Sequence, residues 1–206
     1  MSTNRKNNLE LAIFDLGNVC FETPFEECFR IWEERSSLET GTAFAEYMGD
    51  DVFHRWERGE ISTDEYWRHF CDVLNAQIEF DDWIHGWISI FGKLIQATFD
   101  CILDMKRSGL EVVALSNTNE VHVAHWQNHY PDLAKSFDAI HVSNEVGMRK
   151  PESRIFEYVL SQHSVSAERA VFFDDKLENV QAAESLGIEG VHFTSDMTAI
   201  DWWQSD

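Results

Sequence analysis

The chain has 206 residues and a mass of 24.0 kDa, which suits one domain, or one domain with a modest insertion. Its 37 acidic residues against 16 Lys and Arg produce a formal net charge of −21, which argues against nucleic acid and anionic membrane surfaces as partners, because both attract clustered cations. The hydrophobic fraction of 44%, with 8 Trp and 15 Phe, predicts a packed core and argues against disorder.

The N-terminal part of the chain predicts a buried strand. Residues 11–14 (LAIF) form a short apolar run that ends at Asp15, as is typical of a strand in a parallel sheet. Residues 1–10 are polar and lack the apolar stretch of a signal peptide. The apolar run that begins at residue 11 is too short to span a bilayer, so we expect a cytoplasmic protein.

The next segment predicts a small helical bundle. Over residues 24–95 apolar side chains recur at three- and four-residue steps, and Ser62 with Glu65 forms a capping box before a second helix. Residues 22–93 carry a net charge of −11 and contain five of the eight Trp. We expect the acidic side chains to solvate its outer surface and the aromatic ones to form its core, with Trp56 as a candidate to face a ligand.

The remainder of the chain alternates between predicted helices and strands. We expect strands at residues 111–115, 139–142, 170–173 and 190–193. Between them we expect helices at 99–105, 121–128, 151–163 and 177–186, with Gly109 and Gly187 as stops and Pro151 as the first residue of its helix. Five strands separated by helices predict an α/β fold, a Rossmann-like parallel sheet with helices on both faces.

Acidic and polar residues follow three of the predicted strands. They are Asp15, the pair Ser116 and Asn117, and the pair Asp174 and Asp175. Ligands of such sheets bind beyond the carboxyl ends of the strands, so these side chains should meet at one edge. Carboxylates that close require a raised pKa or a cation between them, and hard oxygen ligands suit Mg²⁺.

Two further groups suit a phosphate ligand at this edge. Ser116 and the backbone N–H groups that follow it form a candidate anion cradle, and Lys150 adds a positive charge. Together with the acidic residues, they predict metal-assisted phosphoryl transfer with a carboxylate nucleophile.

Four segments in this order resemble the motifs of the haloacid dehalogenase superfamily. They are residues 14–19 (FDLGNV), 115–119 (LSNTN), 147–151 (GMRKP) and 172–175 (FFDD), the last followed by Asn179. The first motif is most similar to that of the bacterial sugar-1-phosphate phosphatase subgroup. The resemblance implies a Mg²⁺-dependent phosphatase for a small, sugar-type phosphorylated metabolite. It also implies a catalytic core at residues 1–21 and 94–206, with residues 22–93 as its helical cap.

The resemblance also assigns roles to individual residues. Asp15 is the expected nucleophile and forms an aspartyl phosphate, while Ser116 and Asn117 bind the phosphoryl group. Lys150 bridges the charges of nucleophile and phosphate. The expected Mg²⁺ ligands are Asp15, the main-chain carbonyl of Gly17, Asp175 and Asp174, the last as a ligand or a support, and Asn179 is expected to orient these groups.

One residue departs from the pattern. Phosphatases of this superfamily usually carry a second Asp, a general acid and base, at the position of Gly17. Losing such a group costs about 10²–10⁴ in rate. The chain is then either an enzyme for a good leaving group, such as the hemiacetal of a hexose 1-phosphate, or a slow or vestigial phosphatase. The alternatives are a dehalogenase, which would need no metal, and a non-catalytic sensor of phosphorylated ligands.

Several other residues receive simpler interpretations. Arg149 is expected to be a surface charge, and His122, His125 and His129 are weak candidates for a metal site because no acidic partners accompany them. The four cysteines match no zinc or disulfide spacing and should be free, mostly buried thiols. No dinucleotide fingerprint or P-loop occurs. The sequence leaves the oligomeric state open, and a monomer is compatible with it.

Overall fold

The computed structural model describes residues 5–36, 38–43 and 50–205, and its centre is a five-stranded sheet. All strand pairs are parallel and the strand order is β3-β2-β1-β4-β5, which confirms the predicted α/β class. The strands are β1 (Leu11–Phe14), β2 (Glu111–Ser116), β3 (Ala139–Val142), β4 (Ala170–Asp174) and β5 (Glu189–His192).

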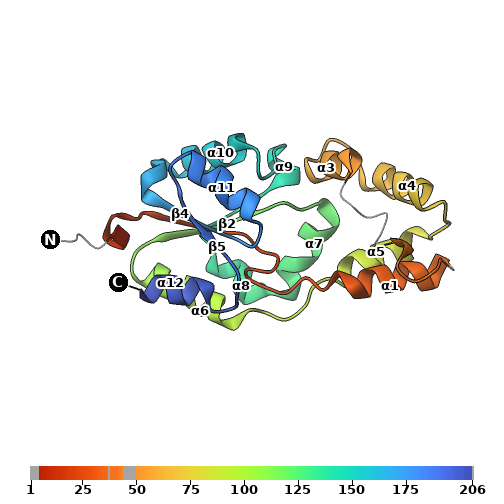
Figure 1. The fold of residues 1–206 in the computed structure, drawn as a ribbon, viewed down its shortest axis with the longest axis horizontal. Coiled ribbons are helices and arrows are strands. Elements are labelled where there is room, and N and C mark those ends of the chain that lie inside the picture. The colour runs from red at the N-terminus through yellow and green to blue at the C-terminus, as the bar shows by residue number, and fades with distance from the viewer. Residues whose placement is uncertain (1–4, 37, 44–49, 206) are drawn as a thin grey trace.

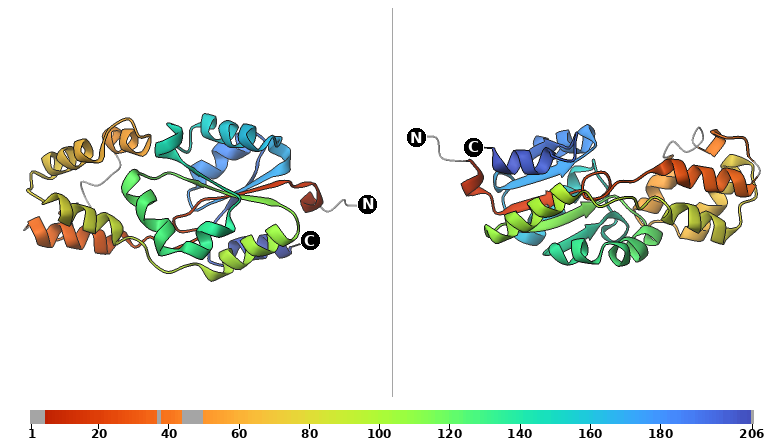
Figure 2. Two further views of the ribbon diagram at one scale, coloured as in Figure 1. Left: turned by 180° about the vertical axis from the view of Figure 1, so that it is seen from behind. Right: turned by 90° about the horizontal axis from the view of Figure 1, so that it is seen from below.

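Helices cover both faces of the sheet (Figures 1 and 2). On one face, Leu11 and Ile13 belong to a cluster with residues of α10 (Ser153–His163) and α11 (Leu177–Ser185). On the other, Ala12 and Phe14 pack with residues of four helices. These helices are α6 (Gln96–Arg107), α7 (Glu120–His129), α8 (Pro131–Ser136) and α12 (Thr198–Gln204). Alternate side chains of one strand thus enter two cores, as a sheet buried on both faces requires.

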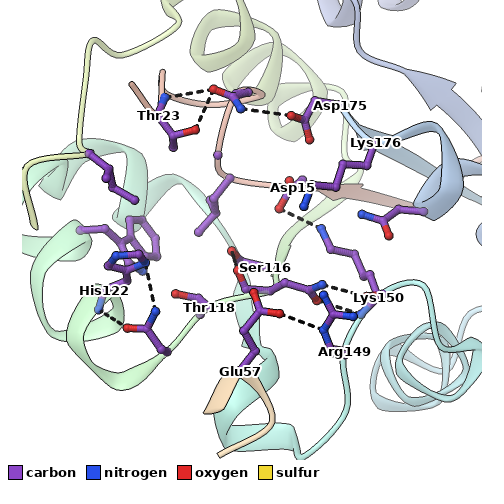
Figure 3. A pocket seen from close by; sticks show the side chains of 18 of the residues that line it. Asp15, Thr23, Glu57, Ser116, Thr118, His122, Arg149, Lys150, Asp175 and Lys176 are labelled. Carbon is purple, nitrogen blue, oxygen red and sulfur yellow. Dashed lines mark hydrogen bonds and ion pairs between the residues drawn. The ribbon is translucent and has the colours of Figure 1, made fainter. Parts of the chain in front are cut away.

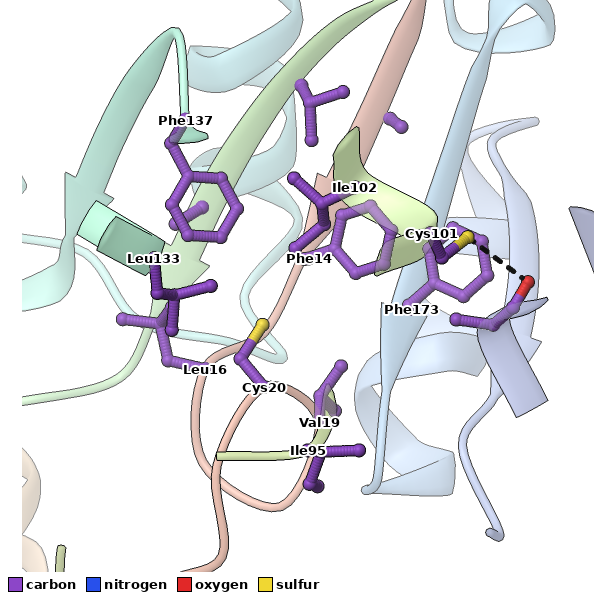
Figure 4. Packing of buried hydrophobic residues seen from close by; sticks show 14 of the residues in the cluster. Phe14, Leu16, Val19, Cys20, Ile95, Cys101, Ile102, Leu133, Phe137 and Phe173 are labelled. Atoms are coloured by element: carbon purple, nitrogen blue, oxygen red, sulfur yellow. Dashed lines mark hydrogen bonds between the residues drawn. The ribbon is translucent and has the colours of Figure 1, made fainter. Parts of the chain in front are cut away.

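The second of these cores includes the residues that flank the end of β1, Phe14, Leu16 and Cys20 (Figure 4). The rings of Phe14 and Phe173, from adjacent strands, stack with centroids 4.4 Å apart. The Cys20 thiol donates to the carbonyl of Asp15 at 3.2 Å. All four cysteines are free and three are buried, as predicted. The close packing around these side chains therefore restrains the backbone of Asp15, which follows β1.

A separate helical unit lies at one end of the molecule (Figure 1). It consists of α1 (Phe25–Ser36), α3 (Asp51–Glu57), α4 (Thr63–Leu74) and α5 (Phe80–Ile88). Its own hydrophobic core is rich in aromatic rings, and the Trp32 indole N–H donates to the carbonyl of Trp83 at 3.0 Å. The predicted capping box of α4 is present, with Ser62 and Glu65 bonded reciprocally.

The two chain segments that join the helical unit to the sheet run side by side. Phe21 and Leu94 form an antiparallel bridge, and Glu22 N–H donates to the carbonyl of Lys93 at 2.9 Å. The helical unit also contacts the sheet domain through Gly59, which packs against the Asn144 carbonyl. A Cβ at Gly59 would lie only 2.2 Å from that oxygen, so a larger residue would clash. That residues 22–93 behave as a cap domain stays a prediction.

The fold differs from expectation at a few elements. Pro151 follows a cis peptide bond and lies in a turn, and α10 begins only at Ser153 with Glu152 as its N-cap, so the predicted role of Pro151 as first helical residue is wrong. Side-chain bonds from Asn117 hold the backbone just before Pro151 outside a helix. The short helices α8, α9 (Ser143–Val146) and α12 were not anticipated. Among the described residues, no helix has the length and apolarity needed to cross a membrane.

Candidate active site

Three neighbouring strands bring the candidate residues to one edge of the sheet. Asp15 directly follows β1, Ser116 ends β2, and Asp174 ends β4 with Asp175 next to it. Because β2, β1 and β4 are adjacent and parallel, their carboxyl ends converge. A cavity of about 550 Å³ opens above them and extends under the helical unit (Figure 3).

Lys150 is the centre of this edge and is almost wholly buried. Its Nζ donates to Asp15 Oδ1 at 2.8 Å, to Asp174 Oδ2 at 2.7 Å and to the Leu115 carbonyl at 2.8 Å. An ammonium group has three N–H donors, so all of them are used. The lysine is therefore held in one position between the two carboxylates.

The electrostatics of the site favour a bound cation. Burial raises the pKa of Asp15 to about 7; Lys150 opposes this shift, and the nearby charges of Asp174 and Asp175 add to it. Burial works against the charged form of Lys150, but the two carboxylates still raise its pKa above the usual value. Lys150 is the ammonium group bonded to these carboxylates, and even with Lys176 also at the cavity the three carboxylates outnumber the ammonium groups, so an incoming cation would neutralise the excess negative charge.

The carboxylates also have the arrangement of a metal site. Ligand oxygens of Asp15, Asp174 and Asp175 lie within 4.8 Å of one another. Asp174 is fully buried and also accepts bonds from the Lys176 N–H at 2.8 Å and the Asn179 amide at 3.0 Å. Asp15 and Asp175 line the cavity and Asp174 does not, so its role as a ligand or a support stays a prediction. This oxygen donor set fits Mg²⁺.

Ser116 and Asn117 both line the cavity at the end of β2, but they differ in their bonds to Lys150. The Asn117 side chain donates to the Lys150 carbonyl and accepts from the Lys150 N–H, both at 2.8 Å. Asn117 thus fixes the backbone of the lysine. A role for its side chain in phosphate binding stays a prediction.

Gly17 lines the cavity next to this edge. A Cβ at this position would lie 3.2 Å from Thr23 Cγ2, which is tight but relieved by a small movement of the threonine. Thr23 is held by Asn18, whose amide also donates to Asp175 at 3.1 Å. A side chain at this position therefore requires a small shift of Thr23, and the glycine itself contributes only backbone.

Comparison with known proteins decides the family. A model of haloacid dehalogenase-like hydrolases matches residues 9–187, which is most of the chain. The chain belongs to this family.

Relatives of this hydrolase match nearly its whole length. It is 23% identical to a D-ribitol-5-phosphate phosphatase of Bacteroides thetaiotaomicron, over 91% of this chain and 96% of the relative. It is 30% identical to the sesquiterpene phosphatase astK of Aspergillus oryzae, over 90% of each chain. A haloacid dehalogenase family enzyme of B. thetaiotaomicron, solved with magnesium and inorganic phosphate, superposes with a TM-score of 0.75 at 22% identity, over 89% of this chain and 93% of the other.

The helical unit of the hydrolase supplies one ion pair at the cavity. Arg149 Nε lies 2.9 Å from Glu57 Oε2, and both side chains are largely buried, at 15% and 8% exposure. The expectation that Arg149 is a surface charge is therefore wrong, because Glu57 of α3 covers it. Burial raises the pKa of Glu57 while Arg149 lowers it. A sequence cannot reveal this pair, since 92 residues separate its members.

Much of the remaining cavity wall in the hydrolase is apolar, with aromatic rings prominent, although polar side chains such as His54, Thr118 and Lys176 also line it. The following apolar side chains line it: Leu16, Phe21, Phe25, Phe53, Trp87, Ile90, Phe91 and Trp126. Trp56, which we considered as a ligand contact, is only 1% exposed and packs inside the helical unit instead. The periodicity that identified these residues as core did not distinguish those that line the cavity.

The three clustered histidines do not form a metal site. Among the described residues, only the Asp15, Asp174 and Asp175 group has the geometry to hold an ion. His122 Nε2 lies 3.1 Å from the Trp87 carbonyl, and the ring stacks edge-on against Trp87 and Phe91. His125 and His129 pack around Phe91. The segment is part of the aromatic wall.

Proposed function

We propose that this hydrolase is a Mg²⁺-dependent phosphatase that hydrolyses a small phosphomonoester through an aspartyl phosphate on Asp15. The observation that carries the proposal is the burial of Lys150 between Asp15 and Asp174, at 2.8 and 2.7 Å. That geometry holds a carboxylate oxygen at the cavity with a fixed positive charge beside it. The names of the two relatives, both phosphatases, support the same reaction.

Each residue of the site has a step in this reaction. Asp15 attacks phosphorus and the bond from phosphorus to the leaving oxygen breaks, with Lys150 balancing charge and Ser116 binding a phosphoryl oxygen. Water then attacks phosphorus, which releases phosphate and regenerates Asp15. Asp15, Asp175 and the Gly17 carbonyl would hold Mg²⁺, with Asp174 as support. The ion would neutralise charge on the phosphoryl oxygens.

Three further expectations from the sequence concern the substrate class, the cellular location and the kind of partner. A sugar-type phosphate is supported by the polyol phosphatase among the relatives, while the second relative is named for a terpene substrate. The four free cysteines support a cytoplasmic location. The net charge of −21 supports a small metabolite rather than nucleic acid or a membrane as partner.

Replacing the nucleophile tests the mechanism. Asp15→Asn should lower kcat by roughly 10⁴-fold or more on any phosphomonoester, because no other group can take its place. Phosphate release with and without EDTA is the measurement, and Asp196→Asn, at an exposed position, is the matched control. In the wild type, beryllium fluoride with Mg²⁺ should form an adduct at Asp15, detectable by fluorine NMR. Retained turnover in Asp15→Asn would contradict the mechanism.

Two outcomes would favour the alternatives. Halide release from a small haloacid that is insensitive to EDTA would indicate a dehalogenase. Mg²⁺-dependent binding of phosphate esters without any turnover would indicate a sensor. Phosphate release that requires both Mg²⁺ and Asp15 excludes both.

A further inference from the structure

The cavity has two chemically different ends. At one end are the charged groups at the sheet edge, and at the other is an aromatic wall provided by the helical unit and α7 (Figure 3). Phe53 and Trp87 are almost parallel, with an interplanar angle of 11° and centroids 6.2 Å apart. A phosphate placed at Asp15 would direct its organic group toward this wall.

The imidazole of His122, a polar group at the wall, is already hydrogen-bonded through both of its nitrogens. The Trp87 carbonyl can only accept a hydrogen bond, so His122 Nε2 must be protonated and donate to it. His122 Nδ1 then accepts from the Asn119 amide at 3.4 Å, and Asn119 Oδ1 accepts from the His122 N–H at 3.1 Å. Both nitrogens of the His122 imidazole are therefore already hydrogen-bonded, and the ring presents mainly its carbon atoms to a ligand. A polyol placed here would exchange water for these carbon surfaces.

The chemistry next to the nucleophile restricts the leaving group as well. Gly17 has no side chain that could donate a proton to the departing oxygen, and the neighbouring Lys150 uses its three N–H groups on Asp15, Asp174 and Leu115. An aliphatic alkoxide, with a conjugate acid near the pKa of water at about 15.7, departs poorly without a proton. A phenolate, with a pKa of about 10, departs readily as the anion.

We infer that the preferred substrates are aryl phosphates, in which the phosphate is attached to an aromatic ring. The inference rests on the proposed phosphatase function and adds the class of the leaving group. The Asp15–phosphorus bond forms as the bond from phosphorus to the aryl oxygen breaks, and the electron pair leaves with the phenolate, which takes a proton from water. The ring stacks on the aromatic wall, where Phe25 and Phe53 are partly exposed.

A substrate series separates ring recognition from leaving-group ability. Phenyl phosphate has both an aromatic ring and a good leaving group, benzyl phosphate only the ring, acetyl phosphate only the leaving group, and ribitol 5-phosphate neither. We expect kcat/KM for phenyl phosphate to exceed that for benzyl and ribitol phosphates by about 10²-fold or more. Equal or faster turnover of ribitol 5-phosphate would overturn the inference.

Variants test the two causes separately. Phe53→Leu, and independently Phe25→Leu, should lower the ratio of kcat/KM for phenyl phosphate to that for acetyl phosphate by about 3- to 10-fold. Phe80→Leu, which is exposed and lies outside the cavity, should leave this ratio unchanged. Gly17→Asp should raise kcat for benzyl phosphate relative to phenyl phosphate, because it restores a proton donor.

The outcomes distinguish this inference from the proposed function. An enzyme that releases phosphate from all four esters in an Asp15-dependent way, but with a ratio insensitive to Phe53 and Phe25, retains the proposed function and refutes the aryl preference. An enzyme that releases phosphate from ribitol 5-phosphate but not from phenyl phosphate refutes the aryl preference alone, and one that releases phosphate from none of the four esters refutes both.

Discussion

The sheet edge and the aromatic wall face the same cavity but are built in opposite ways. At the edge, Lys150 and its carboxylate partners are anchored by short bonds to strands of one rigid sheet. At the wall, rings from several helices meet those of α7, and the buried ion pair of Arg149 with Glu57 joins the two layers beside it, with Arg58 and Glu152 as a second, less buried pair. We therefore expect the reaction chemistry to depend mainly on the sheet and the loops that follow its strands, and selectivity to depend on how the two separately packed cores sit together.

Removing the lysine should have the largest effect after loss of the nucleophile. Lys150→Met leaves Asp15 and Asp174 buried without their cation, which should cost about 3–5 kcal/mol of unfolding free energy in the metal-free protein. The pKa of Asp15 should rise above its value of about 7, so activity should require a higher pH. Urea unfolding and a pH–rate profile measure these effects.

The control for this variant is a lysine on the surface. Lys106 pairs with Asp138 at 2.7 Å, but both side chains are about one-third exposed. Lys106→Met should cost no more than about 1 kcal/mol. Similar losses in the two variants would mean that the sheet edge is no more constrained than the surface.

Breaking the ion pair beside the wall should have an intermediate effect. Arg149→Met leaves the Glu57 carboxylate buried and unpaired, at a cost of about 2–3 kcal/mol, and should raise KM more than it lowers kcat. Arg154→Met, which removes an exposed pair with Glu152, should stay within about 0.5 kcal/mol. The double variant Arg149→Met/Glu57→Leu should recover part of the stability. A fall in kcat at unchanged KM would place Arg149 in the reaction chemistry instead.

An effect of about the same size as that of Arg149→Met is expected in the pH dependence of stability at the wall. Burial lowers the pKa of His122 to about 4, against 6.5 normally. Between these values the unfolded chain binds more protons than the folded one, so this stability is fully present above pH 6.5 and is lost as the pH falls through 4. The loss should be on the order of 2–3 kcal/mol.

His122→Gln isolates this contribution, because glutamine can donate and accept without titrating. We expect a smaller difference in urea midpoint between pH 7.5 and pH 4.5 than in the wild type, while His85→Gln, at an exposed position, keeps the wild-type difference. An unchanged difference in His122→Gln would show that the wall tolerates an imidazolium.

The same contrast explains what the sequence could predict. Local sequence patterns suffice to predict that Asp15, Ser116 and Asp174 lie together, because each follows or ends a strand and parallel strands end at one edge of the sheet. Arg149 was misassigned because its partner Glu57 lies on a helix far away in sequence. Trp56 and Phe53 lie in the same apolar pattern, yet only Phe53 lines the cavity. That difference arises from packing across the two units, which periodicity does not encode.

The paired segments at Phe21 and Leu94 have a consequence for chain entropy. The chain enters and leaves the helical unit at adjacent positions, so the unit is a closed loop inserted into the sheet domain. The entropy cost of closing such a loop grows only logarithmically with the number of residues inserted. The length of the insertion is then nearly neutral for the folding of the sheet. A short linker from Glu22 to Lys93, whose backbones are already bonded at 2.9 Å, could replace the whole unit in a minimal hydrolase core.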